Sequence, residues 1–179
     1  MSRNESKQNK KKPPAFLRWF DGSKVVTDAG EPLVVLHGTP NSFTTFDTFP
    51  AYFTCDRDAA MAYAESQYAR DDHEGVPTVM ELYLALKNPK IIYAEELAIE
   101  APDDDGGICW MSVDNYAFQL EKLGYDGMIL KGVNDFSGMD GDLRQTRAYD
   151  QYVAFNAKQI KIAVAQNPNH DKEHTGPEL

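Results

Sequence analysis

Three strand-like segments lie far apart in this chain, and each carries polar or aromatic side chains among apolar residues. The first is Val34-Val35-Leu36-His37-Gly38-Thr39, in which a β-branched apolar run leads into His-Gly-Thr. The second is Ala51-Tyr52-Phe53-Thr54, and the third is Tyr149-Asp150-Gln151-Tyr152-Val153, where Gln151 interrupts an alternation of apolar residues. Strand ends that each contribute one polar or aromatic group can together form a cleft for a flat, polar ligand. We therefore expect these segments to meet at a binding site.

The other segments predict an α+β fold, because short strands and helices follow one another in irregular order. Strands are expected at residues 32–36, 52–54, 78–86, 91–92, 128–130, 149–155 and 160–164. One helix is expected to begin after Asp56 as N-cap and to run to about residue 68, and a second to run from Ser112 as N-cap to Gly124. A cluster of apolar residues at 16–20, called the apolar knot below, is expected to pack on the rest of the domain. Phe43 and Phe46 are expected to fold back onto the core.

Length and charge limit the organisation and the partners of the chain. Its 179 residues suit one domain at 15–165, a disordered basic arm at 1–14 and a polar tail at 166–179. The net charge of −10 argues against nonspecific binding of nucleic acid, because such binding needs many Lys and Arg side chains that contact the phosphates. The Lys-rich arm is the exception: it is either a contact for nucleic acid or membrane, or a solvated tail.

The cysteines and the hydropathy pattern indicate a reducing, non-membrane environment. Cys55 and Cys109 are too few for a disulfide framework, and no apolar run reaches the length of a membrane span. The polar N-terminal segment has no apolar stretch behind it and is not a signal peptide. The sequence predicts a cytoplasmic protein and no membrane partner, and it leaves the oligomeric state open.

The residues of the three segments suit an aromatic ring that bears a carboxamide. The backbone of Gly38 offers a donor and an acceptor side by side, which a carboxamide requires. Tyr52 and Tyr63 could stack on the two faces of a flat ring, and His37 could bind a hydroxyl group. Each also has a structural interpretation, since a strand-end His is often a satisfied structural residue and a helical Tyr often belongs to the core. These residues together favour a binding site but do not name its ligand.

The same residues resemble the ADP-ribosyltransferase superfamily, on the His-Tyr-Glu branch that includes diphtheria toxin and the poly-ADP-ribose polymerases. His37-Gly38-Thr39 matches the His-Gly-Ser/Thr strand of that branch, and Ala51-Tyr52-Phe53-Thr54 matches its Tyr-Phe strand. Tyr63 lies where the helical stacking Tyr is expected, and Gln151 lies at the position of the catalytic Glu.

A closer resemblance is to the ADP-ribosyltransferase-like domains of phage and mobile-element polyvalent proteins. It rests on further short motifs in order along residues 32–164. They are His37-Gly38-Thr39-Pro40, Phe43-Thr44-Thr45-Phe46-Asp47, Tyr83-Leu84 through Asn88-Pro89, Gly124-Tyr125-Asp126-Gly127 and Gln159-Ile160-Lys161. The resemblance implies a split antiparallel β-sheet with flanking helices and a cleft for NAD.

The resemblance also implies a role for each matched residue in binding NAD as a substrate. Gly38 would hold the nicotinamide carboxamide, Tyr52 and Tyr63 would stack on the nicotinamide ring, and His37 would bond a ribose hydroxyl. The adjoining Thr39, Ser42 and Phe53 would complete the cofactor-binding set, with Thr39 and Ser42 near the ribose and phosphates. The implied catalytic residues are His37, Tyr52 and Gln151.

Two departures from the family pattern bear on the reaction. Ala60 stands where polymerases have a Ser that bonds the carboxamide, which removes about 1 kcal/mol of binding. Gln151 keeps an acceptor oxygen for a ribose hydroxyl but lacks the charge that stabilises the developing ribose cation. Asp150 or Glu81 could replace that charge, although strand alternation points Asp150 away from Gln151.

The predicted function is that of a mono-ADP-ribosyltransferase acting on a macromolecular acceptor, either protein or nucleic acid. A non-catalytic module that binds NAD or ADP-ribose and an NAD glycohydrolase toxin are the alternatives, and polymer synthesis is not expected. The acceptor is expected to contact the loop at residues 131–147. No metal site is predicted: His170-Asp171-Lys172-Glu173-His174 has the spacing of an inverted zinc-protease motif but not its apolar helix.

Overall fold

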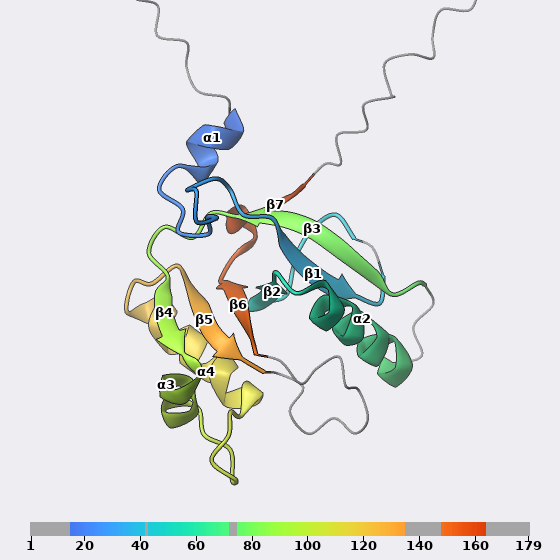
Figure 1. Ribbon diagram of the computed structural model, residues 1–179, viewed down its shortest axis with the longest axis vertical. Coiled ribbons are helices and arrows are strands. Elements are labelled where there is room, and N and C mark those ends of the chain that lie inside the picture. Colours follow the sequence, from blue (N-terminus) through green and yellow to red (C-terminus); the bar gives the residue numbers. More distant parts are fainter. Residues whose placement is uncertain (1–14, 42, 72–74, 135–147, 164–179) are drawn as a thin grey trace, which may run out of the picture.

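A seven-stranded sheet forms the centre of the protein in a computed structural model that describes residues 15–41, 43–71, 75–134 and 148–163. The strand order is β4-β5-β6-β2-β1-β3-β7 (Figure 1). The strands are β1 Val35–Thr39, β2 Ala51–Thr54, β3 Thr78–Leu84, β4 Lys90–Tyr93, β5 Gly127–Val133, β6 Tyr149–Ala154 and β7 Ile160–Ile162. The basic arm at 1–14, Ser42, residues 135–147 of the predicted loop, and the tail with its His-rich motif lie outside the described residues.

Four α-helices in the described part of the chain flank this sheet, so the predicted α+β class is confirmed. They are α1 Ala15–Phe20, α2 Arg57–Asp71, α3 Ala94–Glu100 and α4 Trp110–Lys122. Helix α2 packs on β1 and β3, and α3 and α4 pack on β5 at the other end of the sheet (Figure 1). None of these helices has the length and apolarity needed to cross a membrane.

The sheet is antiparallel except at one edge. Strands β4 and β5 pair in parallel from Lys90–Met128 to Tyr93–Lys131, so the antiparallel pairing that the resemblance implies does not extend to this edge. The physical reason is the connection, because α3 and α4 form a crossover that returns the chain to the same end of the sheet.

The pairing between β1 and β2 is much shorter than that between β1 and β3. Strand β1 pairs with β3 along its whole length, from Val35–Leu82 to Thr39–Thr78. By contrast, β1 pairs with β2 through Leu36 and Thr54. This short contact is the split between the two halves of the sheet, and it lies next to His37.

Two apolar cores lie along the sheet. The first contains Phe53, Tyr152 and Leu82, with Phe43 and Phe46 packed against it as the sequence predicted. The second contains Val153 and Leu130 together with the buried faces of α3 and α4. Because successive residues of a strand point to opposite faces, β2 and β6 contribute side chains to both cores.

Several predicted boundaries are wrong, and tertiary pairing explains most of the differences. Strand β1 covers Val35–Thr39 rather than residues 32–36, because pairing with β3 holds His-Gly-Thr inside the strand rather than after its end. Strand β5 continues to Val133 through a bulge, and α3 was not predicted at all. Helix α4 begins at Trp110, before Ser112, whose amide already donates to the carbonyl of Cys109 at 2.9 Å.

Two local predictions are confirmed by hydrogen bonds and packing. Asp56 caps α2, since its Oδ1 accepts the amide of Ala59 at 3.0 Å. The apolar knot forms α1 and packs on the body through Phe16, whose ring lies edge-on to Tyr83 at 4.9 Å.

Three of the short family-like motifs meet in one polar cluster away from the split. The carboxylate of Asp126 accepts the amides of Lys87 at 2.7 Å and Asn88 at 2.9 Å, which fixes the chain after β3. The buried side chain of Gln159 donates to the Asp126 carbonyl and accepts the amide of Phe155 at 2.9 Å. The cluster ties the ends of β3 and β6 to the start of β5, so these motifs stabilise the fold rather than line the cleft.

Candidate functional site

A cavity of about 800 Å³ opens at the split between β1 and β2. This volume is in the usual range for small-molecule sites. Its walls come from β1, β2 and β6, from helices α2 and α4, and from the loop after β1. Of the predicted site residues that the structure describes, all line this cavity: His37, Gly38, Thr39, Tyr52, Phe53, Tyr63 and Gln151.

His37 is held in a fixed orientation at the split. Its Nδ1 lies 2.8 Å from the carbonyl oxygen of Tyr52, and because a carbonyl only accepts, Nδ1 carries the hydrogen. The rings of Phe43, Phe46 and Phe53 surround the imidazole at 5.0–5.8 Å. Burial among these rings lowers the pKa of His37 below its ordinary value, although the bond to Tyr52 opposes this effect. The imidazole is therefore neutral at physiological pH, and its Nε2 is a hydrogen-bond acceptor.

Gln151 lines the cavity, and the oxygen of its side chain is buried. Its side chain is 5% exposed, and Oε1 has no hydrogen-bond partner among the described residues. The amide Nε2 lies 3.5 Å from the hydroxyl of Tyr149, at the limit of a hydrogen bond. An unsatisfied buried acceptor costs about 1–3 kcal/mol, so a ligand that donates a hydrogen bond to this oxygen would recover that cost.

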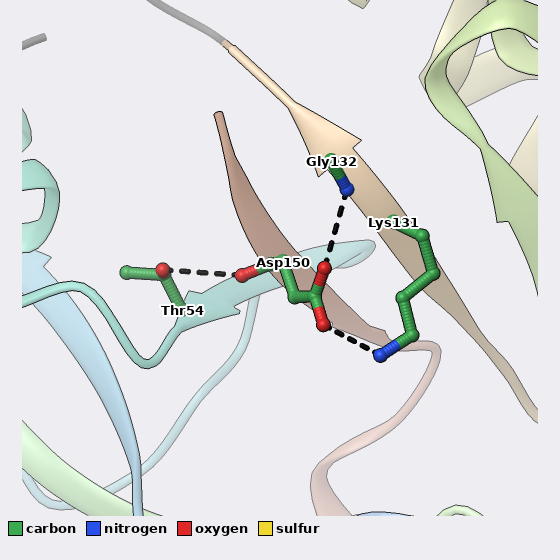
Figure 2. A network of polar contacts seen from close by, with 4 residues as sticks. All are labelled: Thr54, Lys131, Gly132 and Asp150. Carbon is green, nitrogen blue, oxygen red and sulfur yellow. Dashed lines mark hydrogen bonds and ion pairs between the residues drawn. The ribbon is translucent and has the colours of Figure 1, made fainter. Parts of the chain in front are cut away.

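The neighbour Asp150 fixes the backbone that carries Gln151 (Figure 2). Its carboxylate accepts from Lys131 Nζ at 2.5 Å and from the Gly132 amide at 3.2 Å. Its carbonyl accepts from Thr54 Oγ1 at 3.2 Å, which joins β6 to β2. Asp150 does not line the cavity, as strand alternation predicted, and its charge is balanced by Lys131.

Glu81 does not supply a carboxylate to the cavity either. It is about half exposed on β3 and forms a 2.5 Å ion pair with Arg57 at the start of α2. Neither of the two carboxylates considered from the sequence therefore lines the cavity.

Helix α2 lies directly against Gly38. A Cβ atom at this position would lie 1.8 Å from the carbonyl oxygen of Ala60 and 3.1 Å from the amide of Ala64. Gly38 thus has a packing role that the sequence did not reveal: its missing side chain lets α2 approach β1. The same helix presents Tyr63, which is 39% exposed, to the cavity.

Thr39 and Phe53 contribute to the site mainly through its framework. The Thr39 hydroxyl donates to the carbonyl of Asn41 at 2.8 Å and accepts its amide at 3.3 Å, which shapes the loop after β1. Phe53 is 2% exposed and supports the His37 ring from the first core.

Helix α4 adds three residues to the cavity that the sequence did not indicate: Trp110, Met111 and Asp114. The hydroxyl of Tyr52 donates to Asp114 Oδ1 at 2.5 Å, and the Tyr52 ring lies edge-on to Trp110 at 6.2 Å. Trp110 and Asp114 are one helical turn apart and so share a face. That spacing was visible in the sequence, but the prediction that the helix begins at Ser112 left Trp110 outside it.

No cluster of three or more side chains suited to a metal ion occurs in the described residues. The cavity lining there also contains no Lys or Arg, while Asp47 and Asp114 contribute carboxylates. The site is thus aromatic and acidic.

Comparison with known families gives a match. A family described as ADP-ribosyltransferase in polyvalent proteins matches residues 27–170. The chain belongs to this family. Searches of curated proteins and of solved structures gave no match.

Membership of this ADP-ribosyltransferase family confirms the resemblance drawn from the sequence and indicates ADP-ribosylation activity. The matched region includes every strand of the sheet and the whole cavity, whereas α1 precedes it. The family identifies the domain as that of a transferase enzyme.

Proposed function

We propose that this protein transfers a single ADP-ribose unit from NAD to a macromolecular acceptor and releases nicotinamide. The observation that carries the proposal is that one cavity receives His37, Tyr52, Tyr63 and Gln151, whose buried Oε1 has no hydrogen-bond partner among the described residues. These groups fit the nicotinamide riboside half of NAD, which has a flat ring, a carboxamide and ribose hydroxyls.

Each lining group has a role in holding this half of NAD. The rings of Tyr52 and Tyr63 stack on nicotinamide, and the Gly38 backbone binds the carboxamide. His37 Nε2 accepts a hydrogen bond from one ribose hydroxyl, since Nδ1 is engaged by Tyr52. Gln151 Oε1 accepts a second, which satisfies its buried oxygen. Thr39, Ser42 and Phe53 complete the NAD-binding set.

The reaction breaks the carbon–nitrogen bond between ribose and nicotinamide and forms a bond from the same ribose carbon to the acceptor. NAD supplies nicotinamide as the leaving group, which departs with the bonding electrons, and the acceptor group that bonds to the ribose carbon loses its proton to solvent. Gln151 orients the ribose and stabilises its developing positive charge with the dipole of its amide oxygen. This is weaker than a carboxylate, and the loss of such a group lowers rates by about a hundredfold or more. We therefore propose slow mono-transfer and no chain elongation.

Gln151 also supports a second candidate, a module that binds NAD or ADP-ribose without reaction. Hydrolysis of NAD, as by a toxin, is the third, because water can reach the ribose if no acceptor is bound.

Incubation with NAD labelled in its adenylate part distinguishes these functions. Label on a protein or nucleic acid supports transfer, free ADP-ribose alone supports hydrolysis, and saturable binding without nicotinamide release supports the module. Failure of NAD to bind would refute transfer and hydrolysis, and failure of both NAD and ADP-ribose to bind would refute all three.

Two variants test whether the reaction takes place in this cavity. Gln151→Glu is expected to raise nicotinamide release by about a hundredfold, because it restores a full negative charge beneath the ribose. Tyr63→Ala is expected to weaken NAD binding about tenfold without changing the melting temperature, since Tyr63 is partly exposed. Unchanged release by Gln151→Glu in a protein that binds NAD would show that another group performs this role.

A further inference from the structure

Aromatic rings and acidic groups line the cavity. Tyr52, Tyr63 and Trp110 provide aromatic faces or edges, and Asp114 provides a half-buried carboxylate. Among the described lining residues the basic one is His37, and its imidazole is neutral because burial lowers its pKa. Aromatic faces together with a carboxylate are the groups by which proteins bind organic cations.

The carboxylate of Asp114 is fixed in place. Its Oδ1 accepts a hydrogen bond from the Tyr52 hydroxyl at 2.5 Å. Trp110, one turn earlier on α4, lies against the Tyr52 ring. Tyr52 thus connects the carboxylate to the ring-binding part of the cavity.

We propose that Asp114 makes this cavity selective for a positively charged ring, so that the protein binds oxidised NAD, with its cationic pyridinium, in preference to NADH. The inference rests on the proposed function, since it assigns the nicotinamide ring to this cavity. It goes further by naming Asp114 as a specificity-determining residue, which distinguishes ligands by the charge of their ring. Asp47 lines the same cavity but is exposed, and water screens its charge more strongly.

The charge of the ring is tested most directly with two small probes, nicotinamide and 1-methylnicotinamide. Both are aromatic and carry the same carboxamide, but only the second is a cation. We expect wild-type protein to bind 1-methylnicotinamide about tenfold more tightly than nicotinamide, measured by calorimetry or by quenching of Trp fluorescence. Asp114→Asn should reduce this preference to about twofold or less while leaving the affinity for neutral nicotinamide nearly unchanged. The same change should appear in the ratio of affinities for NAD and NADH.

Two control variants separate charge from geometry. Tyr52→Phe removes the hydrogen bond to Asp114 but keeps the ring and the carboxylate, so the preference for the cation should persist. Glu121→Gln removes one negative charge from the exposed surface of the same helix and should leave the preference unchanged. Melting temperatures of all variants establish that each is folded.

The outcomes distinguish failure of this inference from failure of the proposed function. Equal binding of the two probes, or a preference that Asp114→Asn leaves intact, overturns the role of Asp114 while NAD binding stands. Loss of the preference in Tyr52→Phe as well as Asp114→Asn assigns the effect to ring position and also overturns it. Failure of both probes and of NAD to bind refutes the inference and the proposed function together.

Discussion

Replacing Gly38 with Ala tests whether the approach of α2 to β1 builds the cavity. The new Cβ would lie 1.8 Å from the Ala60 carbonyl oxygen and 2.8 Å from the Ala60 carbonyl carbon. These are backbone atoms, so no side-chain rotation relieves the contact. Helix and strand must separate by about 1.5 Å to restore an ordinary distance.

The expected loss of stability follows from this overlap. Overpacking a close contact costs about 1–3 kcal/mol of stability. Because the Ala60 atoms in contact are rigid backbone, we expect Gly38→Ala to cost about 3 kcal/mol. For a domain of this size the melting temperature should fall by about 6–12 °C. Because Tyr63 lies one turn after Ala60 on α2, the displaced helix should also weaken NAD binding.

Urea denaturation and thermal melting measure the loss, with Gly30→Ala as the matched control. Gly30 has φ +79°, and a methyl group added there would meet no atom within 4 Å, so its substitution costs only backbone strain of about 1 kcal/mol. The reasoning is refuted if Gly38→Ala loses no more stability than Gly30→Ala, or if it lies within about 0.5 kcal/mol of wild type.

Two further predictions concern the framework of the site. Burial lowers the pKa of His37 in the folded protein, so the unfolded chain takes up the proton first as the pH falls. The stability that neutral His37 contributes is therefore complete above about pH 6.5, and it is lost as the pH falls from there to the pKa of His37 in the folded protein. His37→Gln should therefore lose less stability than wild type between about pH 7.5 and pH 5 in urea denaturation, and equal losses would contradict this pKa shift. Gln159→Ala should lower the free energy of unfolding by about 3 kcal/mol, because it leaves the buried amide of Phe155 without its acceptor. Asn156→Ala, which removes one exposed bond to the Lys158 amide, should cost about 1 kcal/mol or less, and similar losses in the two variants would count against the buried cluster.

Local sequence signals predicted much of the secondary structure. Asp56 followed by an Ala-rich run predicted α2, and alternation predicted the buried side of β3, where Met80, Leu82 and Leu84 face inward. These features depend on residues close together in the chain, so they can be read without knowing the fold. Strand boundaries and α3 could not be read in this way, because pairing with distant strands and packing on β5 determine them.

The sequence by itself determined the family and the residues that match its motifs, since these are patterns of residue type and order. His37, Tyr52, Tyr63 and Gln151 were identified from such patterns, and the structure places them around one cavity. Only the tertiary structure decided how they are arranged: it left Gln151 Oε1 without a partner among the residues it describes, turned Asp150 toward Lys131, and brought Asp114 of α4 to the hydroxyl of Tyr52. The physical reason is that hydrogen bonding and burial depend on distances between residues far apart in the chain, and these distances exist only once the sheet has formed.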